Sequence, residues 1–497
     1  MPLVPTDTPH RPEARSSLRL ILLTMLTAGG VAVGLSQDAS PTWLAGDSHI
    51  HSHWSPGYDR TVNPPEPIKR GDARYSTPVN AQKAKDFGLS WMVTTDHGGP
   101  NHSKFNLVHA YAELRESRQA VPDVLQFYGM EFNVPAMDHH TLIMPNTDDE
   151  WKTLFNIESQ YDRADAWPAD PARNTEEMGA KALAYMNTLR HLPVMFANHP
   201  SRSAKGVGVY GSDEPREFRN HNDLAPAIYR GMEGAPGHQA GTLARDGAVR
   251  RDADGQPTGN RGGYGNDAAR TFGGFDQMTA IVGGLWDTLL GEGRRFWIVA
   301  TSDSHVHYTD GGSDFWPGEF QKTYVHARKA YDDILGGLRA GRIFVVAGDL
   351  INALDVTART GQAAAAVGES LATRPGDAVQ VEIRFGVPTA ANARGERPTV
   401  ARVDLIAGDV RGPVADRTLD KNDTTRVVAR FTAKEWRCAA GSCTITTTLP
   451  SVTRRGYLRV RGTSSTDAEP PMDARGENPW TDLWFYSNPI FLEVGEK

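Results

Sequence analysis

Histidine and acidic side chains gather in six short clusters of this 497-residue chain, and 15 of its 16 histidines lie between His49 and His326. Imidazole and carboxylate groups are ligands for zinc, manganese and iron, and the two histidines of an H-x-H pair on a strand point to the same side. A single buried histidine is usually a core residue, whereas six clusters in order predict a metal centre. The clusters are DSHIHSHWSPG from residue 47, TTDHG from 94, GMEFN from 129, DHH from 138, NHP from 198 and TSDSH from 301.

Most clusters directly follow an apolar run of strand length, as expected for strands buried on both faces. These runs span 91–95, 127–130, 194–197 and 296–300. Helical patterns lie between them at 79–87, at 175–189 with Asn174 as a candidate N-cap, at 276–290 and at 331–338. The alternation predicts an α/β barrel with its chemistry at the carboxyl ends of the strands. An open doubly wound sheet is the alternative, and ligands from so many successive strands favour the barrel.

These motifs resemble the polymerase and histidinol phosphatase (PHP) superfamily of metal-dependent phosphoesterases over about residues 43–349. The resemblance implies a distorted seven-stranded β/α barrel that binds two or three divalent ions of zinc, manganese or iron. It implies one ion at His49, His51, Glu131 and Asp303, a second at Glu131, His139 and His199, and a third at His97 and His305.

The sequence departs from the family pattern after the H-x-H pair, where the family usually has S-D-G and this chain has Ser55-Pro56-Gly57. The acid of the third metal position is therefore missing, and Asp59 or His53 are the candidate substitutes. His139 is preferred to His140 because of its spacing to the run 141–144. Asp96 is either a ligand or a residue that orients one.

The amidohydrolase superfamily is a rival resemblance, because it also opens with H-x-H on a barrel strand. It usually needs a carboxylated lysine after a middle strand, where this chain has Glu131. The net charge is -7, from 60 acids against 53 bases, with no long basic run. This composition argues against nucleic acid as a standing partner but allows a small phosphate ester.

Several residues near these clusters are candidates for binding substrate. The glycine-rich section 206–274 is expected to build the pocket. Arg202 and Arg261 are candidate phosphate clamps, with placement on the surface as the alternative. Glu233 and His238 follow the strand-like run 227–232, and His238 or His307 is a candidate acid for the leaving group.

The two ends of the chain predict export and a second domain. Arg11, Arg15 and Arg19 precede an apolar run at 20–35, which predicts a signal peptide over residues 1–36, a periplasmic or secreted protein, and no stable membrane span after cleavage. Residues 350–497 show short alternating strands and predict an accessory β-sandwich. In an oxidising compartment, Cys438 and Cys443 would close a small loop.

The resulting hypothesis is an exported phosphoesterase that hydrolyses small phosphate mono- or diesters with a metal-activated hydroxide. A carbamate or carboxylic ester hydrolase with the same centre, as in the carbaryl-hydrolase branch of the superfamily, is the first alternative. A secreted metal-binding or adhesion module without catalysis is the second. The residues expected to act in catalysis are Glu131, Asp303, His238 and Arg202.

Overall fold

The strands that carry the candidate ligands are neighbours in one mixed sheet. The structure is a computed structural model that describes residues 40–265 and 267–495, so the predicted signal peptide lies outside the described residues. In this part of the sheet the order is β1 (Thr42–Ile50), β4 (Trp91–Thr94), β5 (Leu125–Asn133), β6 (His139–Ile143), β7 (Val194–Ala197), β8 (Tyr229–Ala235) and β9 (Trp297–Ala300). Among these seven strands, neighbours run parallel, except that β6 is antiparallel to both β5 and β7.

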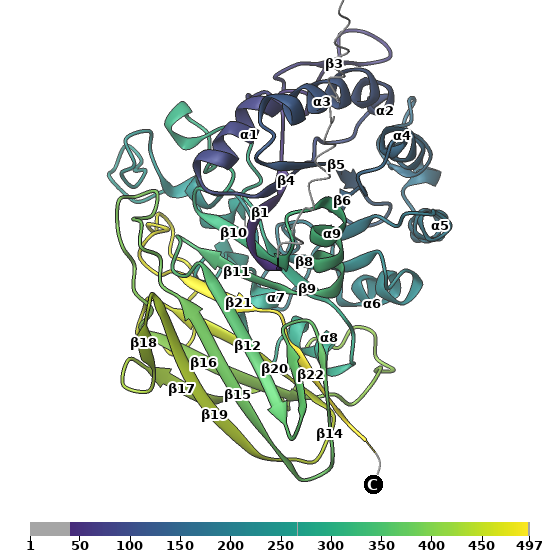
Figure 1. Ribbon diagram of the computed structural model, residues 1–497. Coiled ribbons are helices and arrows are strands. Elements are labelled where there is room, and N and C mark those ends of the chain that lie inside the picture. The colour runs from purple at the N-terminus through teal and green to yellow at the C-terminus, as the bar shows by residue number, and fades with distance from the viewer. Residues whose placement is uncertain (1–39, 266, 496–497) are drawn as a thin grey trace, which may run out of the picture. The chain divides into compact units, whose positions relative to one another are not determined.

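Helices follow most of these strands in the chain and surround the sheet (Figure 1). The helices are α1 (Thr77–Asp86), α2 (His102–Phe105), α3 (Tyr111–Ala120), α4 (Glu150–Tyr161), α5 (Glu176–Asn187), α6 (Pro215–Leu224), α7 (Gln277–Ala280), α8 (Leu285–Gly291) and α9 (Tyr331–Ala340), with a π-helical turn at Asn106–Ala110. Short 3-10 turns occur at Pro171–Arg173, Gln239–Thr242, Arg261–Gly263, Asp267–Ala269 and Tyr308–Asp310.

Two predicted helices differ in detail from the observed ones. The α5 helix is capped by Thr175, whose side chain accepts a hydrogen bond from Met178 N, while the Asn174 side chain accepts one from Ala136 N. The predicted helix 276–290 is two short helices, because the chain turns between them with Gly283 at φ 78°. A left-handed residue ends a helix, so apolar periodicity alone overestimated its length.

The same sheet continues past β1 into the C-terminal part of the chain. Strand β10 (Gln321–Ala327) pairs with β1, β11 (Ile343–Ala347) pairs with β10, and β21 (Trp484–Ser487) pairs with β11. Strands β20 (Gly456–Thr463), β22 (Ile490–Val494), β14 (Ser370–Thr373), β16 (Arg402–Asp409) and β17 (Arg426–Thr432) complete fifteen strands. The aromatic segment that begins at Trp484 is buried in β21, between β11 and β20.

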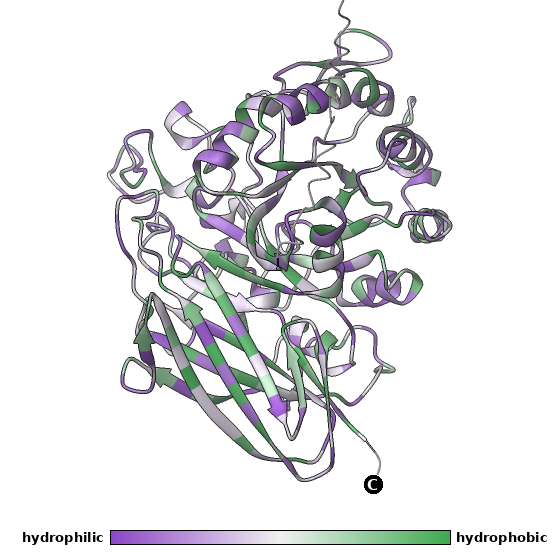
Figure 2. Ribbon diagram, in the orientation of Figure 1, coloured by the Kyte–Doolittle hydropathy of each residue, from purple (hydrophilic) through white to green (hydrophobic). Residues whose placement is uncertain are grey.

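A second sheet has five strands, in the order β13 (Ala363–Ala366), β12 (Ala353–Thr360), β15 (Asp377–Gly386), β19 (Ser442–Val452) and β18 (Arg437–Ala439). Hydrophilic and hydrophobic residues alternate along β15 (Figure 2), and its buried residues Val381 and Ile383 share a hydrophobic cluster with Leu405 of β16 and Val460 of β20. The expected strands of the C-terminal part are therefore present.

A disulfide joins Cys438 and Cys443 across the β18–β19 hairpin. A small hairpin of β2 (Gly57–Asp59) and β3 (Glu66–Ile68) lies near the candidate ligands in sequence.

Across the described residues, no helix combines the length and apolar character that crossing a membrane requires.

Candidate metal centre

The H-x-H pair lies at the carboxyl end of β1, and both imidazoles are fully buried. The Nε2 atoms of His49 and His51 are 2.9 Å apart, and each lies 3.2 Å from Asp303 Oδ1. Glu131 approaches the same two nitrogens at 3.4 and 3.5 Å. His49, His51 and Asp303 form one group of ligand atoms close enough to hold a metal ion.

Glu131 is the centre of a second group, and it lies within β5 rather than after its end as the sequence suggested. His97 Nδ1 is 2.6 Å from Glu131 Oε2, while His199 Nε2 and His139 Nδ1 are 3.0 and 3.1 Å from Oε1. Burial disfavours ionisation of Glu131, but the charges of His139, His97 and His49 hold its pKa well below the usual value. The carboxylate therefore lies between the two groups, as a bridging ligand would.

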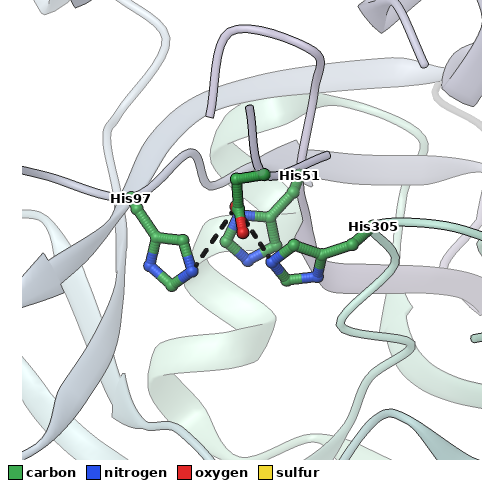
Figure 3. Close-up of side chains that lie close together, drawn as sticks. His51, His97 and His305 are labelled. Atoms are coloured by element: carbon green, nitrogen blue, oxygen red, sulfur yellow. Dashed lines mark ion pairs between the residues drawn. The ribbon is translucent and has the colours of Figure 1, made fainter. Parts of the chain in front are cut away.

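A third group contains an acid that sequence reasoning missed. Asp72 Oδ2 is 3.2 Å from His305 Nε2 and 3.7 Å from His97 Nε2, and these residues form a metal-capable group with His51. Figure 3 shows the three imidazoles around a common point, with the two ion pairs dashed. Burial opposes ionisation of Asp72, yet its hydrogen bond to His305 and the histidine charges hold its pKa below the usual value.

Neither proposed substitute for the missing acid lies in this group. Asp59 is on the β2–β3 hairpin and binds Thr61, and His53 Nε2 contacts Glu113 Oε2 at 2.7 Å. Asp72 comes 15 residues after Gly57, so the search near the H-x-H pair missed it. The β2–β3 hairpin lies between Gly57 and Asp72 in the chain, and only the fold reveals that the chain returns to the histidines after it.

Two buried carboxylate oxygens without a hydrogen-bond donor indicate whether these residues fit a cation. Glu131 Oε2 and Asp303 Oδ1 accept no hydrogen bond from any described residue, although imidazole nitrogens lie within 2.6–3.5 Å. A buried charged oxygen without a hydrogen-bond donor costs free energy of folding. The nearby nitrogens are not in hydrogen-bond geometry with these oxygens, as expected for ligand atoms that surround a common cation. The residues present therefore fit divalent metal ions.

Buried acids behind the ligands hold them in place. Glu233 Oε1 is 2.7 Å from His49 Nδ1, and Glu233 Oε2 accepts the backbone N–H of His199. Such a carboxylate fixes the tautomer of a ligating histidine. Asp96 accepts hydrogen bonds from the backbone and hydroxyl of Ser52, so it anchors the turn after the H-x-H pair. His140 contacts the Tyr229 hydroxyl at 3.0 Å and belongs to none of the metal-capable groups.

Backbone strain concentrates at the same strand ends. His199, His238 and Asp303 have φ values of 31°, 55° and 46°, in the left-handed region that non-glycine residues rarely adopt. A Cβ at Gly237 would lie 2.2 Å from the Cβ of Asp303, so only glycine lets these two loops approach. The loop after β8 is thus pressed against the ligand that follows β9.

A polar pocket of about 330 Å³ opens onto the three groups. Arg202 and His238 line it, and Arg202 Nη2 donates to Asp138 Oδ1 at 3.0 Å.

The other residues expected to bind substrate, His307 and Arg261, do not line this pocket. His307 contacts Glu319 at 2.9 Å, and Arg261 is fully buried against Asp473, Glu477 and Asp482. Arg261 is therefore neither a pocket clamp nor a surface residue, because the three acids hold its guanidinium in the interior.

No protein-family model matches this sequence, and no curated protein matches it either.

Proposed function

We propose that this protein is a metal-dependent hydrolase of small phosphate esters. The observation that carries the proposal is the position of Glu131, whose two oxygens lie within 3.5 Å of ring nitrogens from His49, His51, His97, His139 and His199. Two cations sharing such a carboxylate would, when bound, generate a nucleophile at neutral pH and stabilise both oxygens of an in-line displacement.

The chain's own residues would bind and orient the ester. Arg202 keeps its Nε and Nη1 without a hydrogen-bond partner among the described residues, and its side chain is 34% exposed at the pocket wall. A guanidinium with free donors suits an anionic, tetrahedral group better than a neutral carbamate. This residue favours the phosphoesterase hypothesis over a carbamate or carboxylic ester hydrolase.

The fold proposal is the seven-stranded barrel of the PHP superfamily, built from β1 and β4 to β9. Its support is a parallel bridge between Ile50 and Ser304, with His51 N donating to Ser304 O at 3.1 Å. This contact brings the end of β1 to the segment after β9, as closure of a barrel requires. Export through a signal peptide belongs to the same proposal, and the disulfide supports an oxidising compartment.

Metal analysis and a substrate panel test the proposal. We expect at least two divalent ions per chain, and we expect Glu131→Gln to lose most of them because one carboxylate serves two groups. Turnover should fall at least about 100-fold, equivalent to about 2.7 kcal/mol. Glu382→Gln, an exposed residue of β15, is the matched control and should change neither quantity.

The panel compares an aryl phosphate, an aryl phosphodiester and an aryl carbamate, each with added manganese, zinc or iron. Hydrolysis of either phosphate ester supports the proposal. Turnover of the carbamate alone would move the assignment to a carbamate hydrolase. Full metal content without any turnover would favour a metal-binding module, and wild-type metal content and activity in Glu131→Gln would overturn the site.

A further inference from the structure

Asp314, a buried acid in the loop after β9, contacts two separate segments of the metal centre. Its Oδ1 atom lies 2.5 Å from His238 Nδ1, and its Oδ2 atom accepts the backbone N–H groups of His305 and Val306, each at 2.7 Å. The Asp314 side chain is 2% exposed. One carboxylate thus joins the loop after β8 to the segment that carries His305.

The main chain around Asp314 is also closely packed. Asp314 N donates to Val306 O at 3.3 Å, Tyr308 N donates to Asp314 O at 2.9 Å, and a Cβ at Gly312 would lie 1.7 Å from Val306 O. The loop 305–314 therefore folds back on itself. This packing holds the Asp314 carboxylate in one place. Asp314 lines the pocket beside His238 and His305.

Hydrogen-bond chemistry makes these contacts directional. An ionised carboxylate only accepts, so His238 must carry a proton on Nδ1 where it meets Asp314. The opposite ring nitrogen, Nε2, lies 2.8 Å from Asp303 Oδ2 and meets a second acceptor there, so both ring nitrogens donate, while Asp303 Oδ1 faces His49 and His51. The orientation of the His238 ring and the course of the segment 305–306 thus depend on the same residue.

We propose that Asp314 is a positioning residue of the metal centre, which orients the His238 ring and holds His305 where it can act as a ligand beside Asp72. This inference rests on the proposed function, because it assigns Asp314 a role toward the metal ions of that site. A carboxylate behind a ligand typically changes metal affinity or activity about 10–100-fold when it is removed.

Cobalt titration followed by visible absorption, with steady-state kinetics in parallel, tests the inference. In Asp314→Ala, the weakest-bound cobalt ion should lose about 10–100-fold in affinity and its absorption band should change, because the backbone N–H groups of His305 and Val306 lose their acceptor. The value of kcat should fall more than KM rises. Asp254→Ala, an exposed acid, is the control that should match the wild type.

Asp314→Asn separates the two contacts. Its amide oxygen still accepts the His305 and Val306 N–H groups, so cobalt affinity should return toward the wild-type value. Its amide nitrogen can only donate to His238 Nδ1, so Nδ1 can no longer donate to residue 314 and the contact that orients the ring is lost, and kcat should remain low. This variant also keeps the test decisive if Asp314→Ala does not fold.

Wild-type cobalt affinity, absorption and kcat in Asp314→Ala would overturn the inference, and so would equal cobalt affinities for Asp314→Ala and Asp314→Asn. The cobalt readouts need no substrate. A changed spectrum in a protein that hydrolyses none of the esters would therefore retain the role of Asp314 and reject the proposed phosphoesterase function.

Discussion

At the scale of single residues, the candidate centre is organised by carboxylates that face more than one histidine. Glu131 and Asp303 each present one oxygen that accepts no hydrogen bond from the described residues. The other oxygen of Glu131 contacts Asn198 and His199, and the other oxygen of Asp303 contacts His238. Burial alone would favour the neutral acid, but the surrounding imidazoles hold the pKa of both carboxyl groups well below the usual value. Both acids should therefore be charged, which is the form that binds a cation.

Asp72 provides a prediction at this scale. Asp72→Asn should remove or weaken one ion, because Asp72 is the single acid beside His51, His97 and His305 in that group. The ions associated with Glu131 and Asp303 should remain, so zinc content measured by elemental analysis should fall by about one per chain and not to zero. Asp59→Asn is the matched control on the β2–β3 hairpin. Equal zinc content in Asp72→Asn and the wild type would contradict the third position.

At the scale of elements, strand ends decide which side chains meet. The chain bends sharply after β7, β8 and β9, where His199, His238 and Asp303 adopt left-handed backbone conformations. Neighbouring strands bring these bends together, and the surrounding packing maintains the strain. The order of the clusters along the sequence suggests the strand-end pattern, whereas the bends themselves depend on contacts between loops.

Gly237 tests the contact between two of these loops. Gly237→Ala places a methyl group against Asp303 Cβ and Ser302 O, so one loop must move and metal content should fall together with activity. Gly336→Ala in α9 is the matched control, because a Cβ there meets no atom within 4 Å and the helix should gain up to about 1 kcal/mol. Metal analysis and urea denaturation of both variants provide the comparison. Undiminished metal binding in Gly237→Ala would show that the close approach is unnecessary.

At the scale of the whole molecule, the C-terminal strands and the candidate site share one sheet. Strand β21 lies between β11 and β20, and the described residues from Ser40 onward form a single compact unit. Arg261 links the glycine-rich section to the C-terminal segment through Asp473, Glu477 and Asp482. Residues on both sides of position 350 therefore contribute to one body, and the accessory role of residues 350–497 stays a prediction.

Arg261→Met should lower the free energy of unfolding by about 3–5 kcal/mol, because it leaves three buried or half-buried carboxylates without their cation. Metal content of the protein that remains folded should change little, since Arg261 touches none of the metal-capable groups that contain histidine. Arg359→Met, an exposed residue of β12, should stay within about 0.5 kcal/mol of the wild type in urea denaturation. A small loss of stability in Arg261→Met would mean that the acids are protonated or hydrated instead.

Much of this protein was determined by local sequence patterns. The apolar runs predicted β4, β5, β7 and β9, and the alternating patterns within residues 350–497 predicted short strands such as β15, because side-chain periodicity is a local property of a strand. The six clusters of histidines and acids contained every ligand of the three groups described above except Asp72.

Tertiary structure alone decided what came together from distant segments. Asp72 and Asp314 belong to none of the sequence motifs, and each contacts the centre because a hairpin or the loop after a strand returns the chain to it. Arg261 looked like a pocket residue in sequence, yet three acids more than 200 positions away hold it in the interior. Sequence patterns record which face of an element is apolar, whereas the partner of a buried charge depends on contacts between elements far apart in the chain.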